Sequence, residues 1–210
     1  MGSSMSNKIN HIYRSIEGWF NFEDLYSDVA NFLAKDDWKL VEIGCWQGRS
    51  SSFLATELAN SGKKFDFYCV DTWSGSEEHL NESSDHYNPL VKQEDWLYNR
   101  FMDNMQTLQE YFTPIRKESV EAAKDFEDNS LDFVFIDASH DYDNVMADLE
   151  AWYPKMKKCE CCGHSESILA GHDFPFDGVA KAVMDFCFKN KLQWKSGRKH
   201  VSDTCWRIYV

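Results

Sequence analysis

The sequence predicts a doubly wound α/β fold: a sheet of about seven strands, mostly parallel with an antiparallel C-terminal strand, and helices on both faces. Three observations predict it. Short apolar runs typical of buried strands alternate with segments whose apolar residues recur at helical spacing. The run 131–137 is almost continuously apolar, as in a strand buried on both faces. Two apolar segments near the C-terminus are joined by a link too short for a crossover helix, so they should pair antiparallel.

Length, composition and charge restrict the class of protein. With 210 residues the chain suits one domain over 1–210, which we divide into a helical extension at 1–35 and a core at 36–210. The formal net charge of -13 repels polyanions, so we expect a small-molecule partner, no nucleic acid and no membrane, and we leave a homo-oligomer open. No apolar run approaches the ~20 residues that cross a bilayer, and no signal-like N-terminus is present, which predicts a cytoplasmic protein.

The first part of the chain alternates helix and strand. Apolar residues between Phe22 and Leu33 recur at helical spacing, which predicts an amphipathic helix before the first strand. The segment 39–44 is a short buried strand that passes through a glycine turn into a helix capped by Ser50. The apolar run 65–71 is a second strand, and it ends on a carboxylate.

A polar loop at 73–95 follows, and it is longer than usual connections. We expect a lid over the ligand site in preference to a disordered excursion. A helix at 97–108 and a strand at 112–116 come next, the strand weakened by Pro114. The remaining elements are expected in this order: a short helix at 120–123, the central strand at 131–137, a helix at 145–156, a strand at 167–171, a helix at 179–186 and strands at 192–195 and 204–210.

The turn after the first strand predicts a nucleoside ligand. In an open parallel sheet, ligands bind beyond the carboxyl ends of the strands, where glycines such as Gly44 and Gly48 let the backbone approach closely. Asp71 ends the second strand at a separation close to the ~20 residues at which an acidic side chain holds a ribose diol. Trp46 occupies the place of the second glycine of a pyrophosphate fingerprint, which disfavours NAD.

The E-x-G-x-x-x-G arrangement from Glu42 to Gly48, followed by Val-Asp-Thr-Trp at 70–73, resembles the first two motifs of class I S-adenosylmethionine-dependent methyltransferases, which have a Rossmann-like fold. The resemblance implies S-adenosylmethionine as cofactor, with its methionine tail on the glycines, its amine near Glu42, its ribose on Asp71 and its adenine near Ser119. The alternative is that the glycines only form a tight turn and Asp71 is a solvated strand end. The cofactor-binding residues implied are Glu42, Gly44, Trp46, Gly48, Asp71, Thr72, Trp73, Ser119 and Asp137.

A second motif pair follows later strands. The pattern I-D-x-x-H-x-Y at 136–142, with Gly-His-Asp at 171–173, resembles methyltransferase family 24, which is similar to the macrocin-type sugar O-methyltransferases and the catechol O-methyltransferases. The resemblance covers roughly residues 39 to 190 and implies O-methylation of a hydroxyl on a sugar or similar metabolite. The chain departs from the family's pattern at 158–164, where close relatives often carry a Pro-Gly-Gly turn.

Four side chains in these motifs are candidates for the chemistry. His140, Asp137 and His172 are the candidate catalytic residues, since a hydroxyl acceptor must lose a proton. Asp137, His172 and Asp173 are the candidate ligands of a divalent cation, Mg²⁺, Mn²⁺ or Zn²⁺. The histidine shifts the preference from Mg²⁺ towards Mn²⁺ or Zn²⁺. The alternative is that Asp137 and Asp173 only form hydrogen bonds and no metal binds.

The remaining motifs and rival functions are open at this stage. Cys159, Cys161, Cys162 and His164 are more typical of a polar insertion than of a zinc site, because adjacent cysteines are poor joint ligands. The cysteines inside apolar segments should be reduced. Two other function classes remain: a metal-dependent oxidoreductase or hydrolase on the same fold, and a cofactor-binding module without catalysis. Acceptor-pocket roles for Trp73 and Tyr142 compete with plain packing.

Overall fold

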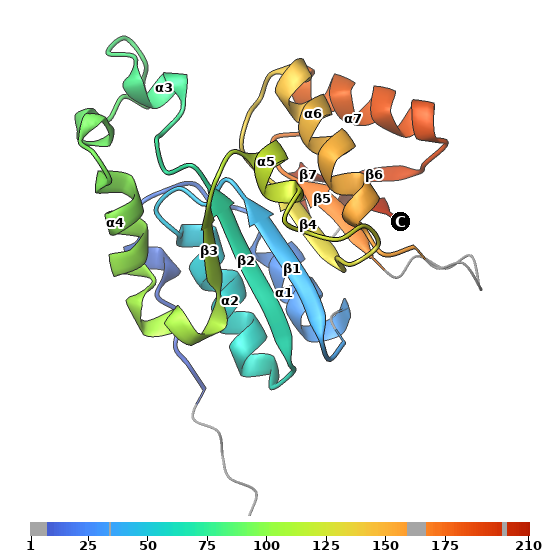
Figure 1. The fold of residues 1–210 in the computed structure, drawn as a ribbon, viewed down its shortest axis with the longest axis horizontal. Helices are drawn as coiled ribbons and strands as arrows, with labels where there is room; N and C mark the ends of the chain where they lie inside the picture. Colours follow the sequence, from blue (N-terminus) through green and yellow to red (C-terminus); the bar gives the residue numbers. More distant parts are fainter. Residues whose placement is uncertain (1–7, 34, 159–166, 199–200) are drawn as a thin grey trace, which may run out of the picture.

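A seven-stranded sheet runs through the computed structural model, which describes residues 8–33, 35–158, 167–198 and 201–210 (Figure 1). The strand order is β3-β2-β1-β4-β5-β7-β6. The first five strands in the chain pair in parallel, and β7 pairs antiparallel with both β5 and β6, which confirms the predicted fold class. The strands are β1 (Trp38–Ile43), β2 (Phe65–Asp71), β3 (Thr113–Arg116), β4 (Phe133–Ile136), β5 (Ile168–Gly171), β6 (Trp194–Arg198) and β7 (Val201–Tyr209).

Helices cover both faces of the sheet, as alternate strand residues require. Leu40 and Phe135 pack with helices on one face, whereas Val41 and Ile136 pack with helices on the other. The first face carries α1 (Glu23–Asp28), α2 (Arg49–Ser61) and α4 (Trp96–Asn104). The second carries α5 (Ser119–Ala123), α6 (Tyr142–Trp152) and α7 (Asp177–Asn190), which are grouped together in Figure 1.

The strand register brings the predicted site residues to one edge of the sheet. Ile43 of β1 pairs with Ile136 of β4 and with Val70 of β2, and Ile136 also pairs with Gly171 of β5. The residues that follow these strand ends are therefore neighbours. The chain passes from β3 at one edge to β4 beside β1, so the strand order reverses here, at the position where open α/β sheets bind ligands.

The segment 73–95 folds into two short helices, each with a side-chain cap at its start. It contains α3 (Glu77–Leu80) and the 3-10 helix η3 (Pro89–Lys92). Ser76 and His79 form a capping box at the start of α3, and the Asn88 side chain accepts a hydrogen bond from the backbone N–H of Leu90. Whether the segment moves as a lid stays a prediction.

Short irregular helices occupy four other connections. The predicted N-terminal helix begins as α1 and continues as the π-helix η2, and the predicted helix at 97–108 ends earlier and passes into η4. The bounds are η1 (Tyr13–Ser15), η2 (Val29–Leu33), η4 (Gln106–Tyr111) and η5 (Tyr153–Lys155).

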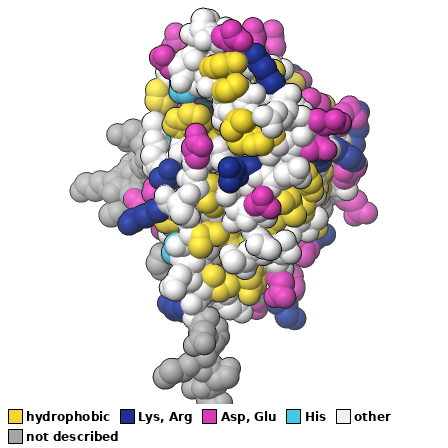
Figure 2. All heavy atoms as spheres, turned by 90° about the vertical axis from the view of Figure 1, so that its left-hand side faces the viewer, with side chains coloured by type: hydrophobic (Ala, Val, Ile, Leu, Met, Phe, Trp, Pro, Cys, Tyr) yellow, Lys and Arg dark blue, Asp and Glu magenta, His cyan; other side chains and the backbone are white. Residues whose placement is uncertain are grey.

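The helices, the surface and the cysteines also bear on the sequence expectations. No helix of the described ranges has the length and apolar composition needed to span a bilayer. On the face that carries α3 and α4, apolar side chains lie between acidic and basic ones, and the basic ones are dispersed (Figure 2). Cys45, Cys69, Cys187 and Cys205 are buried and free, as expected. The candidate zinc residues at 159–164 lie outside the described residues.

Candidate active site

The turn between β1 and α2 brings two strand ends into close contact. Gly44 and Gly48 have φ angles of 86° and 93°, a left-handed region that glycine adopts without strain. A Cβ atom on Gly44 would clash with the backbone oxygen of Asp137. The turn therefore needs glycine at position 44 because the chain after β1 passes directly against the chain after β4.

Asp71 ties this turn to the end of β2. Its Oδ2 accepts hydrogen bonds from the backbone N–H groups of Cys45 and Trp46, at 2.8 and 3.0 Å, and its Oδ1 accepts one from Trp73 at 2.7 Å. Burial raises the pKa of Asp71, and these backbone N–H groups oppose that shift. Asp71 is half-buried as a whole residue. Its part in shaping the turn was not foreseen from the sequence, and its predicted ribose contact stays a prediction.

Glu42 lies beneath the turn and is completely buried. It accepts hydrogen bonds from the hydroxyl of Tyr26, at 2.9 Å, and from the hydroxyl of Ser51. Burial raises the pKa of Glu42 to about 7, although the hydroxyl donors oppose the shift. Near neutral pH the carboxyl group is thus close to the midpoint of its titration.

This pKa predicts a pH-dependent gain in stability for Glu42→Gln. The pKa of Glu42 is about 7 in the folded chain against a usual 4.5, so between these values the folded state binds more protons. The free energy of unfolding therefore falls as pH rises through this window, by about 3 kcal/mol in all. Urea unfolding at pH 5.5 and pH 8 should show a gain for the variant that is larger at pH 8. An equal difference at both pH values would contradict the raised pKa of Glu42.

The aromatic residues of the two motifs pack in different environments. Trp46 is half-buried, and its ring stacks on His79 with ring centroids 4.1 Å apart. Trp73 is buried, packs on Phe101 at 4.7 Å, and donates its indole N–H to the backbone oxygen of Trp46 at 3.0 Å. Its contacts are thus those of a packing residue. Trp19, which was not singled out in the sequence, lies 6.2 Å from Trp46 by ring centroids.

The two remaining predicted cofactor residues use their hydroxyls within the protein. Ser119 begins α5 and accepts a hydrogen bond from the indole N–H of Trp152 at 2.9 Å. Thr72 is half-buried and accepts a hydrogen bond from the backbone N–H of Ser74 at 3.2 Å. These contacts leave their predicted cofactor roles as predictions.

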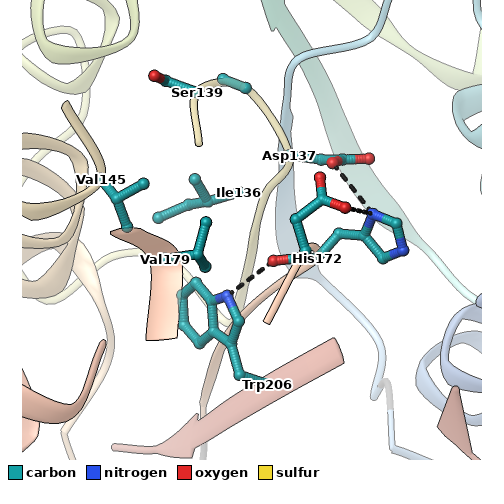
Figure 3. A pocket seen from close by; sticks show the side chains of 9 residues that line it. Ile136, Asp137, Ser139, Val145, His172, Val179 and Trp206 are labelled. Carbon is teal, nitrogen blue, oxygen red and sulfur yellow. Dashed lines mark hydrogen bonds and ion pairs between the residues drawn. The ribbon is translucent and has the colours of Figure 1, made fainter. Parts of the chain in front are cut away.

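Beyond the ends of β4 and β5, four of the predicted residues meet. Nδ1 of His172 lies 3.4 Å from Oδ1 of Asp137 and 3.1 Å from Oδ1 of Asp173 (Figure 3). On the other side, Nε2 of His140 donates to Oδ2 of Asp173 at 2.8 Å. Asp173 therefore bridges the two histidines. Its φ angle of 57° is left-handed, an uncommon conformation for a non-glycine residue that is often found at functional sites.

Because these side chains lie so close together, each of them shifts the pKa of its neighbours. Burial opposes protonation of His172, but the hydrogen bonds to Asp137 and Asp173 raise its pKa to about 10. Burial acts on Asp173 as well, yet the hydrogen bonds from His140 and His172 hold its pKa well below its usual range. Burial raises the pKa of Asp137. The two carboxylates thus favour a positive charge between them, which a proton or a metal ion can supply.

His140 is fixed from three directions. Besides its bond to Asp173, its ring stacks on Phe176 with centroids 4.6 Å apart and an interplanar angle of 9°. A Cβ atom on Gly178 would clash with the backbone oxygen of His140, so the start of α7 approaches closely only because position 178 is glycine. The bond to Asp173 is the main cause of a raised pKa for His140. In the described part of the chain, no residue forms a hydrogen bond with Nδ1 of this ring.

Two groups of potential metal ligands occur within the described residues. Ligand atoms of Asp137, His172 and Asp173 all lie within 4.8 Å of one another, and their mixture of carboxylate oxygen and imidazole nitrogen fits Mn²⁺ or Zn²⁺. Glu42, Cys45 and Cys69 form the other group. Burial raises the pKa of both thiols, and Glu42 in this group already accepts hydrogen bonds from the hydroxyls of Tyr26 and Ser51.

Comparison with known proteins identifies relatives in sequence. The family model of methyltransferase family 24, a methyltransferase domain, matches residues 41–173. The uncharacterised protein y4gI of Sinorhizobium fredii is 30% identical over 118 residues, which are 56% of this chain and 12% of that protein. The uncharacterised protein R132 of Acanthamoeba polyphaga mimivirus is 28% identical over 138 residues, 64% and 53% of the two chains. The chain therefore spans 12% and 53% of the length of these curated relatives.

Solved structures share the fold at low sequence identity. The O-methyltransferase NovP has a TM-score of 0.63 at 14% identity, covering 89% of this chain and 76% of that one. The precorrin-6y C5,15-methyltransferase of Geobacter metallireducens has a TM-score of 0.61 at 13% identity, covering 94% and 96%. At these identities the likeness concerns the fold alone.

Proposed function

Because the chain belongs to methyltransferase family 24, among the class I S-adenosylmethionine-dependent methyltransferases, we propose that it transfers a methyl group from this cofactor to a hydroxyl of a small molecule. The observation that carries the proposal is the pair His140–Asp173 beside Asp137 and His172, at the sheet edge that also carries the glycine turn. A sugar or similar polyol is the acceptor that the family resemblance favours. NovP, which shares the fold, is itself named an O-methyltransferase.

The residues at the end of β1 fit the cofactor. Gly44 and Gly48, in left-handed conformations, let the chain turn sharply between β1 and α2, and Asp71 lies beside this turn, where a class I methyltransferase would hold the ribose. The cofactor, when bound, supplies a methyl group on a sulfonium that is already an activated leaving group. The protein's task is therefore to place the acceptor in line and to accept its proton.

His140 is the proposed general base. Its Nε2–H donates to Asp173 at 2.8 Å, so Nδ1 is the nitrogen that accepts the proton of the acceptor hydroxyl. Asp173 orients the ring and stabilises the imidazolium that forms, and Phe176 restricts its rotation. A histidine whose second nitrogen is bound by a carboxylate is the usual arrangement for a base in nucleophile activation.

A divalent cation held by Asp137, His172 and Asp173 would make the same hydroxyl more acidic. The donor set favours Mn²⁺ or Zn²⁺ over Mg²⁺, because imidazole is a better ligand for the former. Asp137 and Asp173 contribute oxygens from the ends of two adjacent strands, β4 and β5. Their negative charge is then balanced by the cation instead of a proton on His172.

Isothermal titration with S-adenosylmethionine and S-adenosylhomocysteine tests the cofactor assignment. We expect dissociation constants in the micromolar range, and a coupled assay for S-adenosylhomocysteine release over a panel of sugars and catechols should then identify the acceptor class. The assay is run with EDTA, Mg²⁺, Mn²⁺ and Zn²⁺. Absence of binding at millimolar cofactor would refute the proposed function. Tight iron binding without cofactor binding would favour the oxidoreductase alternative.

A further inference from the structure

Both nitrogens of the His172 ring have partners, and they differ in kind. Nδ1 faces the carboxylates of Asp137 and Asp173, at 3.4 and 3.1 Å. Nε2 lies 2.9 Å from Oδ1 of Asn21 and 2.9 Å from Oγ1 of Thr204. These last two residues come from opposite ends of the chain: Asn21 precedes α1, and Thr204 lies in β7.

The hydrogen atoms available determine which nitrogen carries the proton. Oδ1 of Asn21 has no hydrogen and can only accept. The hydroxyl of Thr204 donates to this same oxygen at 3.2 Å, so only its lone pairs remain for His172. Both partners of Nε2 are therefore acceptors, and Nε2 must be the donor. Without a metal ion, Nδ1 also carries a proton and donates it to the two carboxylates. A cation bound between Asp137 and Asp173 would replace that proton, and the lone pair of Nδ1 would then be its ligand.

We infer that Asn21 and Thr204 are positioning residues for His172, which hold its proton on Nε2 and so present Nδ1 as a metal ligand between Asp137 and Asp173. Metal-binding histidines generally donate their other ring N–H to such an outer partner, which fixes the tautomer and the ring orientation. This inference rests on the cation in the proposed function. It assigns a role at the site to residues outside the motifs, one of them in the N-terminal extension.

The buried side of the ring supports the same orientation. The ring of Phe22, which is almost fully buried, lies 4.9 Å from the His172 ring by centroids. The backbone oxygen of His172 accepts the indole N–H of Trp206 at 3.2 Å (Figure 3). Packing thus limits the position of the residue, while Asn21 and Thr204 decide which nitrogen faces the carboxylates.

Metal binding by variants of these two residues tests the inference. Thr204→Val removes the hydroxyl at nearly constant shape, and Asn21→Leu removes the amide. The double variant should bind Mn²⁺ roughly 10–100-fold more weakly than wild type, the usual effect of losing outer partners of a ligand. The conservative single variant Thr204→Ser keeps the hydroxyl and should bind Mn²⁺ with wild-type affinity. Asn31→Leu, in η2, is a matched control because the Asn31 side-chain amide donates to Ser27 and Glu57 and not to the site.

Two further readouts separate positioning from a general structural defect. The visible absorption spectrum of bound Co²⁺ should change in the double variant and not in Thr204→Ser, because it reports the ligand set. Affinity for S-adenosylhomocysteine should stay within a factor of two, which shows that the fold is intact. If wild type binds Mn²⁺ and the double variant binds it equally well, the inference is wrong and the proposed function stands. If wild type binds none of the three cations Mn²⁺, Zn²⁺ and Co²⁺, the metal in the proposed function is wrong, and the inference falls with it.

Discussion

His140→Ala should lower the rate of methyl transfer by about 10²–10⁴-fold, the usual contribution of a positioned general base. The reason is geometric: with Nε2 bound to Asp173 at 2.8 Å, His140 has one nitrogen left to receive the acceptor's proton. The affinity for S-adenosylhomocysteine should not change, because the ring belongs to the β4–α6 loop and not to the glycine turn. Single-turnover rates with saturating cofactor and acceptor measure the effect.

The control for this prediction is another half-exposed histidine with a carboxylate partner. His11 lies 2.8 Å from Glu57 on the surface of α2, so His11→Ala changes the same kind of pair away from the proposed site. It should leave the rate unchanged. A His140→Ala enzyme that keeps more than about a tenth of the wild-type rate at neutral pH would exclude His140 as the base.

Asp71→Ala should both weaken the cofactor complex and destabilise the fold. Removal of the carboxylate leaves the backbone N–H groups of Cys45, Trp46 and Trp73 without their acceptor. Hydrogen bonds to a charged group contribute about 1.5–3 kcal/mol each, so the free energy of unfolding should fall by at least about 3 kcal/mol. The dissociation constant of S-adenosylhomocysteine should rise by roughly 100-fold or more, since the turn and the proposed ribose contact are lost together.

Urea unfolding and calorimetric titration at a temperature where the variant is folded measure the two effects separately. Asp66→Ala is the matched control, because Asp66 lies on the same strand with an exposed side chain. Asp71→Asn keeps one acceptor oxygen and should fall between wild type and Asp71→Ala on both scales. Unchanged cofactor affinity in a destabilised Asp71→Ala protein would limit Asp71 to a structural role.

Most of the helices and strands can be predicted from the local spacing of apolar residues, whereas their arrangement in the sheet is predicted by general rules for α/β folds. The strand β4 is an example: it is covered on both faces, so all of its residues are buried, and the sequence shows it as a continuous apolar run. The short strand β3 is less clear in the sequence because it carries Pro114 at the edge of the sheet. The short helix α3 was harder to predict, since its four residues show no repeated apolar spacing and its start is marked only by the capping box of Ser76 and His79.

The residues of the candidate site also divide into those whose position the sequence predicts and those that only the folded chain reveals. Asp137, His172 and Asp173 follow parallel strands, and parallel strands end at one edge, so their meeting could be expected from sequence. Asn21 and Phe176 belong to segments that no strand register places, and only the folded chain shows that they contact His172 and His140. The raised pKa of Glu42 could not be predicted from the sequence either, because the burial of a polar strand residue depends on which elements cover it in the folded chain.

The segment before β1 has a consequence for where this domain begins. Tyr26 supplies a hydroxyl to the buried Glu42, and Asn21 an oxygen to His172, yet both residues precede the match to the family model at 41–173. A boundary drawn at the first strand would cut through the site, leaving a buried carboxyl group short of a donor and a histidine short of an acceptor. The extension therefore contributes to the proposed site, and a relative that lacks it would need other residues for both tasks.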